Sequence, residues 1–177
     1  REIRCFASER SAGKTVEFAG EPVSVERVTP ECFKGVEIAF FSAGSVQSKA
    51  FAPMAVRAGA IVIDKSSAFR MDPDVPLVGP EINPHAVKGH KGIVASPNCT
   101  TVGMVFSLKP LYDRFGISSV LMTSMQAVSG AGRSPGVLSY DILDNIIPFI
   151  PKEEEKVQTE TQKILGKLDG GKIINAP

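Results

Sequence analysis

No apolar run in the 177-residue sequence approaches the roughly 18 residues of a membrane span, and its start, Arg1-Glu2-Ile3-Arg4, has no signal-peptide pattern. The net charge is only +1, so neither a large basic field for nucleic acid nor attachment to a membrane is expected. Just three cysteines occur, Cys5, Cys32 and Cys99, without the close pairing of a disulfide framework or the spacing of a metal site. These absences predict reduced thiols, no bound metal and a cytoplasmic protein.

A glycine-rich phosphate loop is also missing, because neither GxGxxG nor GxxGxxG occurs in the chain. Residue 1 is not methionine, and residues 172–177 predict a strand that has just begun. We therefore expect an internal piece of a longer protein, large enough for one domain or two small ones. Hydrophobic residues make up 43% of the sequence and charged residues 22%, which is the balance of a soluble globular protein.

The middle of the chain alternates apolar runs with helical patterns. Near-continuous apolar runs, typical of buried strands, occupy 36–41, 60–64 and 93–95. Helical spacing follows the first and the third run, over 46–58 and from about 100 to 115. This order predicts an α/β fold with a doubly wound parallel sheet.

Polar loops follow these three runs and a fourth, short strand expected over 1–7. These loops lie at 8–13, 42–45, 64–70 and 96–101. Ligands of doubly wound sheets bind outside the carboxyl ends of the strands, so the four loops are the expected ligand site.

The pattern changes after Gly116. A long strand is expected over 117–128, a glycine-rich turn over 129–136 and a helix near 137–145. The clearest helix of the chain covers 152–165, with glutamates in its first turn and a lysine in its last. We therefore place a domain boundary near residue 98.

Cys99 lies in the motif Ser96-Pro97-Asn98-Cys99-Thr100-Thr101, between an apolar run and a helical pattern. Proline ends the extended chain, which places the thiol at or just before a helix N-terminus. Exposed backbone N–H groups and the helix dipole favour a thiolate there, and the thiolate is the nucleophile. The alternative is a buried cysteine at a strand–helix joint.

Three segments together resemble the aspartate-semialdehyde dehydrogenase family: the motif at 96–101, Gln126-Ala-Val-Ser-Gly-Ala-Gly132 and the glutamate-rich helix at 153–166. The likeness extends over the whole chain, from Ala7-Ser8-Glu9-Arg10-Ser11-Ala12-Gly13 to the final Asn-Ala-Pro. It implies a Rossmann-like NADP-binding domain over 1–97 and part of an α+β catalytic and dimerisation domain over 98–177.

The resemblance also implies an activity and an assembly. Such an enzyme reduces L-aspartyl-4-phosphate to L-aspartate 4-semialdehyde with NADPH through a cysteine thioester, releasing phosphate. The reaction belongs to the biosynthesis of lysine, threonine, methionine and isoleucine. The implied assembly is a homodimer or a homotetramer.

Roles for individual residues follow from the same resemblance. Cys99 resembles the nucleophile, and Gln126 the side chain that orients the acyl intermediate. The cofactor residues that it implies are Arg10 and Ser11 at the 2′-phosphate, then Ser42, Ala43, Gly44, Ser129 and Gly130. The residues that it implies for substrate and phosphate are Arg70, Asn98, Lys156 and Glu160.

Some positions depart from the family pattern. Lys65 stands where the family usually has asparagine. The family's glycine-rich loop is expected before residue 1, and its acid/base histidine and substrate-carboxylate arginine after residue 177. The isolated piece is therefore expected to be inactive.

Three alternatives remain open. The first is N-acetyl-γ-glutamyl-phosphate reductase, which shares the thioester chemistry. The second is a cysteine hydrolase with Cys99 as nucleophile, and the third a non-catalytic piece that only binds a partner.

Overall fold

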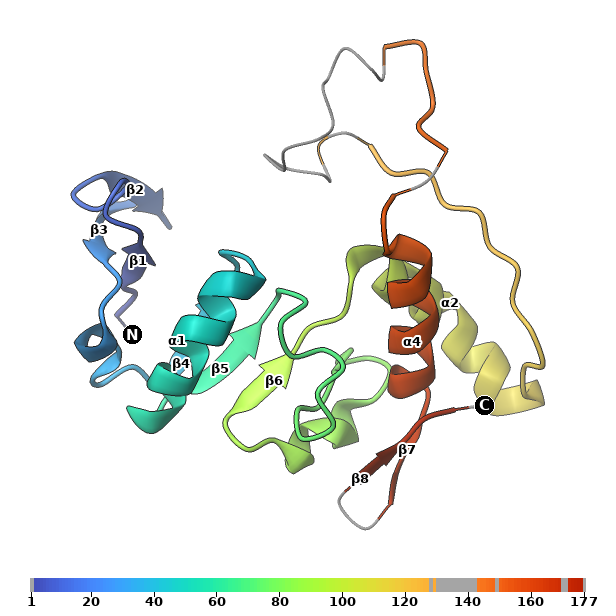
Figure 1. The fold of residues 1–177 in the computed structure, drawn as a ribbon. Helices are drawn as coiled ribbons and strands as arrows, with labels where there is room; N and C mark the ends of the chain where they lie inside the picture. The colour runs from blue at the N-terminus through green and yellow to red at the C-terminus, as the bar shows by residue number, and fades with distance from the viewer. Residues whose placement is uncertain (1, 128, 130–142, 149, 170–171, 177) are drawn as a thin grey trace.

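The computed structural model describes residues 2–127, 129, 143–148, 150–169 and 172–176 of the chain. Its elements run from a small N-terminal sheet, through a parallel sheet with a covering helix, to a pair of helices and a C-terminal hairpin (Figure 1). No helix in these described ranges is both long and apolar enough to cross a membrane.

The N-terminal sheet has three strands in the order β1-β3-β2. These are β1 (Cys5–Ala7), β2 (Thr15–Phe18) and β3 (Glu21–Arg27). β2 and β3 form an antiparallel hairpin, and β1 pairs with β3 in parallel. A 3-10 helix, η1 (Pro30–Phe33), follows and has a proline at its start.

The central sheet is parallel, with the strand order β4-β5-β6. β4 (Ile38–Phe41), β5 (Ile61–Asp64) and β6 (Ile93–Ala95) coincide with the three apolar runs of the sequence. Helix α1 (Ser45–Arg57) connects β4 to β5, and the 3-10 helix η2 (Pro84–Gly89) precedes β6. The predicted α/β class with a Rossmann-like parallel sheet is therefore confirmed.

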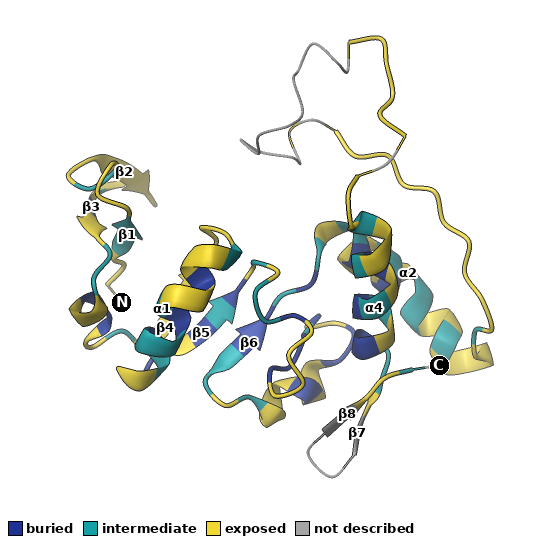
Figure 2. Cartoon of the chain, viewed as in Figure 1, coloured by how far each residue is buried: buried dark blue, intermediate teal, exposed yellow. Residues whose placement is uncertain are grey.

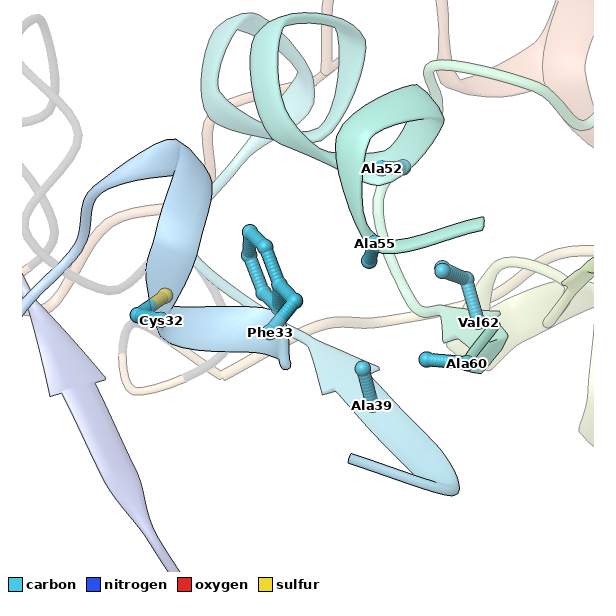
Figure 3. Close-up of a cluster of buried hydrophobic side chains, with 7 residues drawn as sticks. All are labelled: Cys32, Phe33, Ala39, Ala52, Ala55, Ala60 and Val62. Carbon is cyan, nitrogen blue, oxygen red and sulfur yellow. The ribbon is translucent and has the colours of Figure 1, made fainter. Parts of the chain in front are cut away.

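One core cluster lies between α1 and the parallel sheet (Figure 3). Its buried members are Cys32, Phe33, Ala39, Ala52, Ala55, Ala60 and Val62. Ser48, Ala52 and Ala55 are the buried residues of α1, so a single face of the helix is buried (Figure 2). Small alanine side chains allow the helix to pack closely on the strands.

Two long helices follow the sheet and pack against each other (Figure 1). They are α2 (Cys99–Phe115) and α4 (Glu153–Ile164). A second core cluster joins them to β6 and to the irregular loop before it, through Val75, Leu77, Ile82, Ala95, Val105 and Ile164. The antiparallel hairpin of β7 (Lys167–Asp169) and β8 (Lys172–Ile174) comes after α4.

The expected strand over 117–128 is wrong for its described part. Residues 117–127 have no regular secondary structure and are exposed apart from the half-buried Ile117 (Figure 2). A strand needs a neighbour for its backbone N–H and C=O groups, and no described strand pairs with this segment. The helix expected near 137–145 lies mostly outside the described residues. Within its described part, residues 143–144 form a turn.

Candidate active site

The carboxyl ends of β4, β5 and β6 lie at one edge of the parallel sheet. Phe41 is in register with Asp64, and Asp64 with Ala95. Three of the four predicted polar loops therefore leave the sheet at the same edge. The fourth, at 8–13, follows β1 of the separate N-terminal sheet.

Cys99 is the first residue of α2 and is exposed. The N-cap is Asn98, whose side-chain Oδ1 accepts a hydrogen bond from the Thr100 N–H at 2.8 Å. The cap fixes the first turn of a 17-residue helix, and no acidic residue occupies that turn. Cys99 thus stands exposed at the first turn of a helix, rather than in the core.

Arg70 and Glu160 form a buried ion pair beside this helix start. Arg70 Nη1 lies 3.0 Å from Glu160 Oε1, and the two residues are 8% and 1% exposed. The guanidinium also donates from Nε to the Ser96 carbonyl and from Nη2 to the Lys65 carbonyl, both at 2.9 Å. Three hydrogen bonds hold Arg70, and two of its N–H groups are left for a further acceptor.

The second carboxylate oxygen of Glu160 binds the loop at 96–101, which contains Cys99. Glu160 Oε2 accepts a hydrogen bond from the Asn98 N–H at 2.7 Å. Both carboxylate oxygens therefore have charged or backbone donors, as a buried carboxylate requires. This engagement leaves Glu160 badly placed for the substrate-amino role that the resemblance implied.

Lys156 and Glu153 lie one and two turns before Glu160 on α4, on the same helix face. Thr100 Oγ1 donates to Glu153 Oε1 at 3.2 Å, and Lys156 Nζ lies 3.6 Å from Glu153 Oε2. Spacings of three, four and three along α4 place 153, 156, 160 and 163 on one helix face. The sequence reasoning missed Glu153, although its position at i−3 from Lys156 was a usable signal.

Lys163 is the last member of this face and is 4% exposed. Its Nζ donates to the carbonyls of Arg70, Asp72 and Val75 at 2.7, 2.7 and 2.8 Å. Burial lowers the pKa of Lys163 to about 8, and the nearby Asp72 acts in the opposite direction. Lys163 thus holds the loop from Arg70 to Val75 against α4.

We expect the buried Lys163 ammonium to make the free energy of unfolding depend on pH. Its pKa is lowered from 10.5 to about 8, so between these values the unfolded chain binds more protons at this site. The penalty for burying the charge is present below pH 8 and is relieved as pH rises toward 10.5, by up to about 3 kcal/mol. Urea unfolding of wild type and Lys163→Met at several pH values measures the difference.

The Lys163→Met variant has no titrating group at this position. Its free energy of unfolding relative to wild type should therefore fall as pH rises from 8 to 10.5. The exposed Lys88→Met change is the matched control and should leave the difference constant. A wild-type minus Lys163→Met difference that stays flat from pH 8 to 10.5 would contradict this account.

Asp64 is a second buried carboxylate, at the end of β5, that the sequence reasoning had treated only as a strand end. It is 0% exposed and accepts from Ser48 Oγ at 2.7 Å, and from the N–H and Oγ of Ser66 at 3.0 and 2.9 Å. Ser48 belongs to α1 and Ser66 to the loop that reaches Arg70. Asp64 therefore joins the start of α1 to that loop.

The loop between β4 and α1 has a shape that suits an anion. Gly44 has φ +94°, a conformation that L side chains rarely adopt, and no side chain caps α1. The first N–H groups of this 13-residue helix, whose first turn has no acid, are thus open to a ligand.

Other predicted residues lie elsewhere. Arg10 is exposed, and Ser11 half-buried, in the turn after β1. Gln126 and Ser129 are exposed, and Gly130 lies outside the described residues. The Lys65 side chain is exposed, while its carbonyl holds Arg70. In the part of the chain that is described, no three His, Cys, Asp or Glu residues gather as metal ligands would.

Two family models match most of the chain. One is described as semialdehyde dehydrogenase, NAD binding domain, and matches residues 1–90. The other is described as semialdehyde dehydrogenase, dimerisation domain, and matches residues 108–176.

Curated relatives and solved structures agree with these matches. An aspartate-semialdehyde dehydrogenase of Aquifex aeolicus is 43% identical, over 93% of this chain and 57% of its own length. The crystal structure of aspartate semialdehyde dehydrogenase II from Vibrio cholerae has a TM-score of 0.84 at 40% identity, covering 93% of this chain and 58% of that one. The corresponding Candida albicans protein, solved with NADP, has a TM-score of 0.76 at 30% identity, over 99% and 57%. The chain thus spans rather more than half the length of these relatives.

Proposed function

The chain belongs to the aspartate-semialdehyde dehydrogenase family, and on that premise we propose that it carries the nucleophile and much of the cofactor site of an enzyme that makes L-aspartate 4-semialdehyde. The substrates are L-aspartyl-4-phosphate and NADPH, and phosphate is released. The observation that carries the proposal is the exposed Cys99 at the start of α2, in a loop whose Ser96 carbonyl accepts a hydrogen bond from Arg70 at 2.9 Å. The loop that presents the thiol is thus held by a cation that suits a phosphate.

The chemistry begins at Cys99. The Sγ thiolate attacks the acyl carbon of aspartyl phosphate, a C–S bond forms, the C–O bond to phosphate breaks, and a thioester results. Gln126 orients the acyl group in this proposal. NADPH supplies the hydride when it is bound. The thiolate is regenerated when the aldehyde leaves.

Phosphate is held by Arg70 and Lys156, with Asn98 nearby, in this proposal. Arg70 retains two N–H groups after its three bonds, and Lys156 lies one turn before Glu160 on the same face of α4. For the substrate amino group we propose Glu153 in place of Glu160. Glu153 is bonded to Thr100, the residue after Cys99, whereas both Glu160 oxygens are already engaged.

NADP is the proposed cofactor, and residues of two loops are proposed to bind it. Gly44, with Ser42 and Ala43, offers the backbone approach and the open start of α1. Arg10 and Ser11 hold the 2′-phosphate, and Ser129 and Gly130 the nicotinamide end. The Candida albicans relative was solved with NADP, which supports this choice.

We propose that the protein assembles as a homodimer or a homotetramer. The match of residues 108–176 to a dimerisation domain supports self-association. The boundary between the two domains near residue 98 stays a prediction.

The activity is tested with the protein that contains this chain. It should form NADPH from aspartate semialdehyde and NADP only when phosphate is present. N-acetylglutamate semialdehyde should be a poor substrate, and a preference for it would favour the reductase of N-acetyl-γ-glutamyl phosphate instead. Hydrolysis of an acyl substrate without any use of NADP would favour a cysteine hydrolase.

Arg10 should decide the preference for NADP over NAD. Arg10→Ala is expected to weaken NADP binding by about 1.5–3 kcal/mol, the scale of a charge-assisted hydrogen bond, and to leave NAD nearly unchanged. The exposed Lys34→Ala is the matched control and should alter neither affinity. Titration of both cofactors measures the effect, and equal weakening of the two would refute the assignment.

A further inference from the structure

Glu160 connects two loops that leave neighbouring strands. Arg70 lies in the segment after β5, and Asn98 in the segment after β6. One Glu160 oxygen accepts from Arg70 Nη1 at 3.0 Å, and the other from the Asn98 N–H at 2.7 Å. The carboxylate itself comes from α4, which follows these segments by more than 50 residues.

The two donors lie next to groups that the proposed reaction uses. Asn98 caps α2, so its backbone sets where the helix and Cys99 begin. Arg70 is the proposed phosphate ligand. A side chain that is 1% exposed and bonded through both oxygens has little freedom to move. The distance between the thiol and the guanidinium therefore depends on it.

We infer that Glu160 is a positioning residue that fixes Cys99 relative to Arg70, a role that rests on the proposed function and differs from binding the substrate. It acts through geometry, because it holds both loops. It also acts through charge, because its carboxylate pairs with Arg70 and accepts from the N–H of Asn98, the residue before Cys99. Glu153, Lys156 and Lys163 are the other charged residues on the same face of α4, and Lys163 donates to the carbonyl of Arg70 itself.

Two substitutions separate the two actions. Glu160→Gln keeps an oxygen for the Asn98 N–H and loses the charge, while Glu160→Asp keeps the charge and is one carbon too short to reach both donors. Glu154→Gln, exposed on the same helix, is the matched control. Two measurements are made on all three variants and on wild type. One is steady-state kinetics, and the other is the rate at which iodoacetamide modifies each cysteine, followed by mass spectrometry.

Both Glu160 variants should lower kcat by about 100-fold, the cost of a small misplacement of reacting groups, with the KM for NADP within twofold of wild type. Iodoacetamide should modify Cys99 at least about threefold faster in Glu160→Gln than in wild type, because a negative charge near the thiol is gone. In Glu160→Asp, which keeps the charge, Cys99 should react at the wild-type rate. Cys5 and Cys32 should keep their rates in both variants.

A kcat equal to that of Glu154→Gln in both variants would overturn the positioning role. So would equal acceleration at all three cysteines, which indicates loosening of the whole fold. The modification rates need no turnover, so they test Glu160 even if the wild-type protein proves inactive on aspartate semialdehyde. That inactivity would overturn the proposed function instead.

Discussion

Replacement of Cys99 by alanine is expected to lower phosphate-dependent NADPH formation by about 1,000-fold or more, and to leave NADP binding unchanged. The thiolate forms the only covalent bond to substrate in the proposed reaction, so no other described group replaces it. The proposed cofactor residues, 10–11, 42–44 and 129–130, do not include it. Initial rates and a cofactor titration on the same preparation separate the two effects.

Cys5 and Cys32 provide the controls for Cys99. Cys5→Ser changes a half-buried thiol at the start of β1 and should keep wild-type turnover. In the wild-type protein, iodoacetamide should modify the exposed Cys99 before the buried Cys32. Turnover that survives in Cys99→Ala would show that the nucleophile lies elsewhere and would remove the basis of the proposed mechanism.

The local features of this fold could be predicted from its sequence because they depend on nearby residues. Apolar runs located β4, β5 and β6, although one face of β4 is open in the structure, with Ile38 54% and Phe40 72% exposed. Proline and asparagine before Cys99 located the start of α2. The acidic first turn and basic last turn of 152–165 located α4 to within a residue at each end.

The contacts across the site could not be predicted in the same way. Arg70 and Glu160 are 90 positions apart, and Lys163 reaches carbonyls of residues 70, 72 and 75. Spacing along α4 showed that Lys156 and Glu160 share a face, but not which groups lie opposite. The resemblance assigned Glu160 to the substrate amino group, which stays untested, and nothing in the sequence indicated that its carboxylate would accept from Arg70 and Asn98.

The segment 117–127 shows another limit of the pattern. Its apolar residues favoured a strand, but a strand exists only with a partner. In the described part of the chain no neighbour supplies one, and Leu121 and Met125 are exposed. Gln126 lies in this segment, so its role in orienting the acyl group stays a prediction.

Arg70→Met is expected to have the largest effect on stability, with a loss of about 3–5 kcal/mol in the free energy of unfolding. The substitution removes the cation and leaves the Glu160 carboxylate, 1% exposed, with a single donor from Asn98. It also removes the donors to the carbonyls of Lys65 and Ser96. Equilibrium urea unfolding at pH 7 measures the change.

A double substitution distinguishes the unpaired charge from lost packing. In Arg70→Met/Glu160→Gln the buried site is neutral and the Asn98 N–H keeps an acceptor, so the cost should fall to about 1–3 kcal/mol, that of one unsatisfied amide. Lys91→Met breaks an ion pair whose side chains are 73% and 70% exposed, and should unfold at the wild-type urea concentration. A double variant that is no more stable than Arg70→Met would contradict this account. It would mean that the guanidinium stabilises the site by packing and by its bonds to the two carbonyls, and that its charge pairing with Glu160 contributes little.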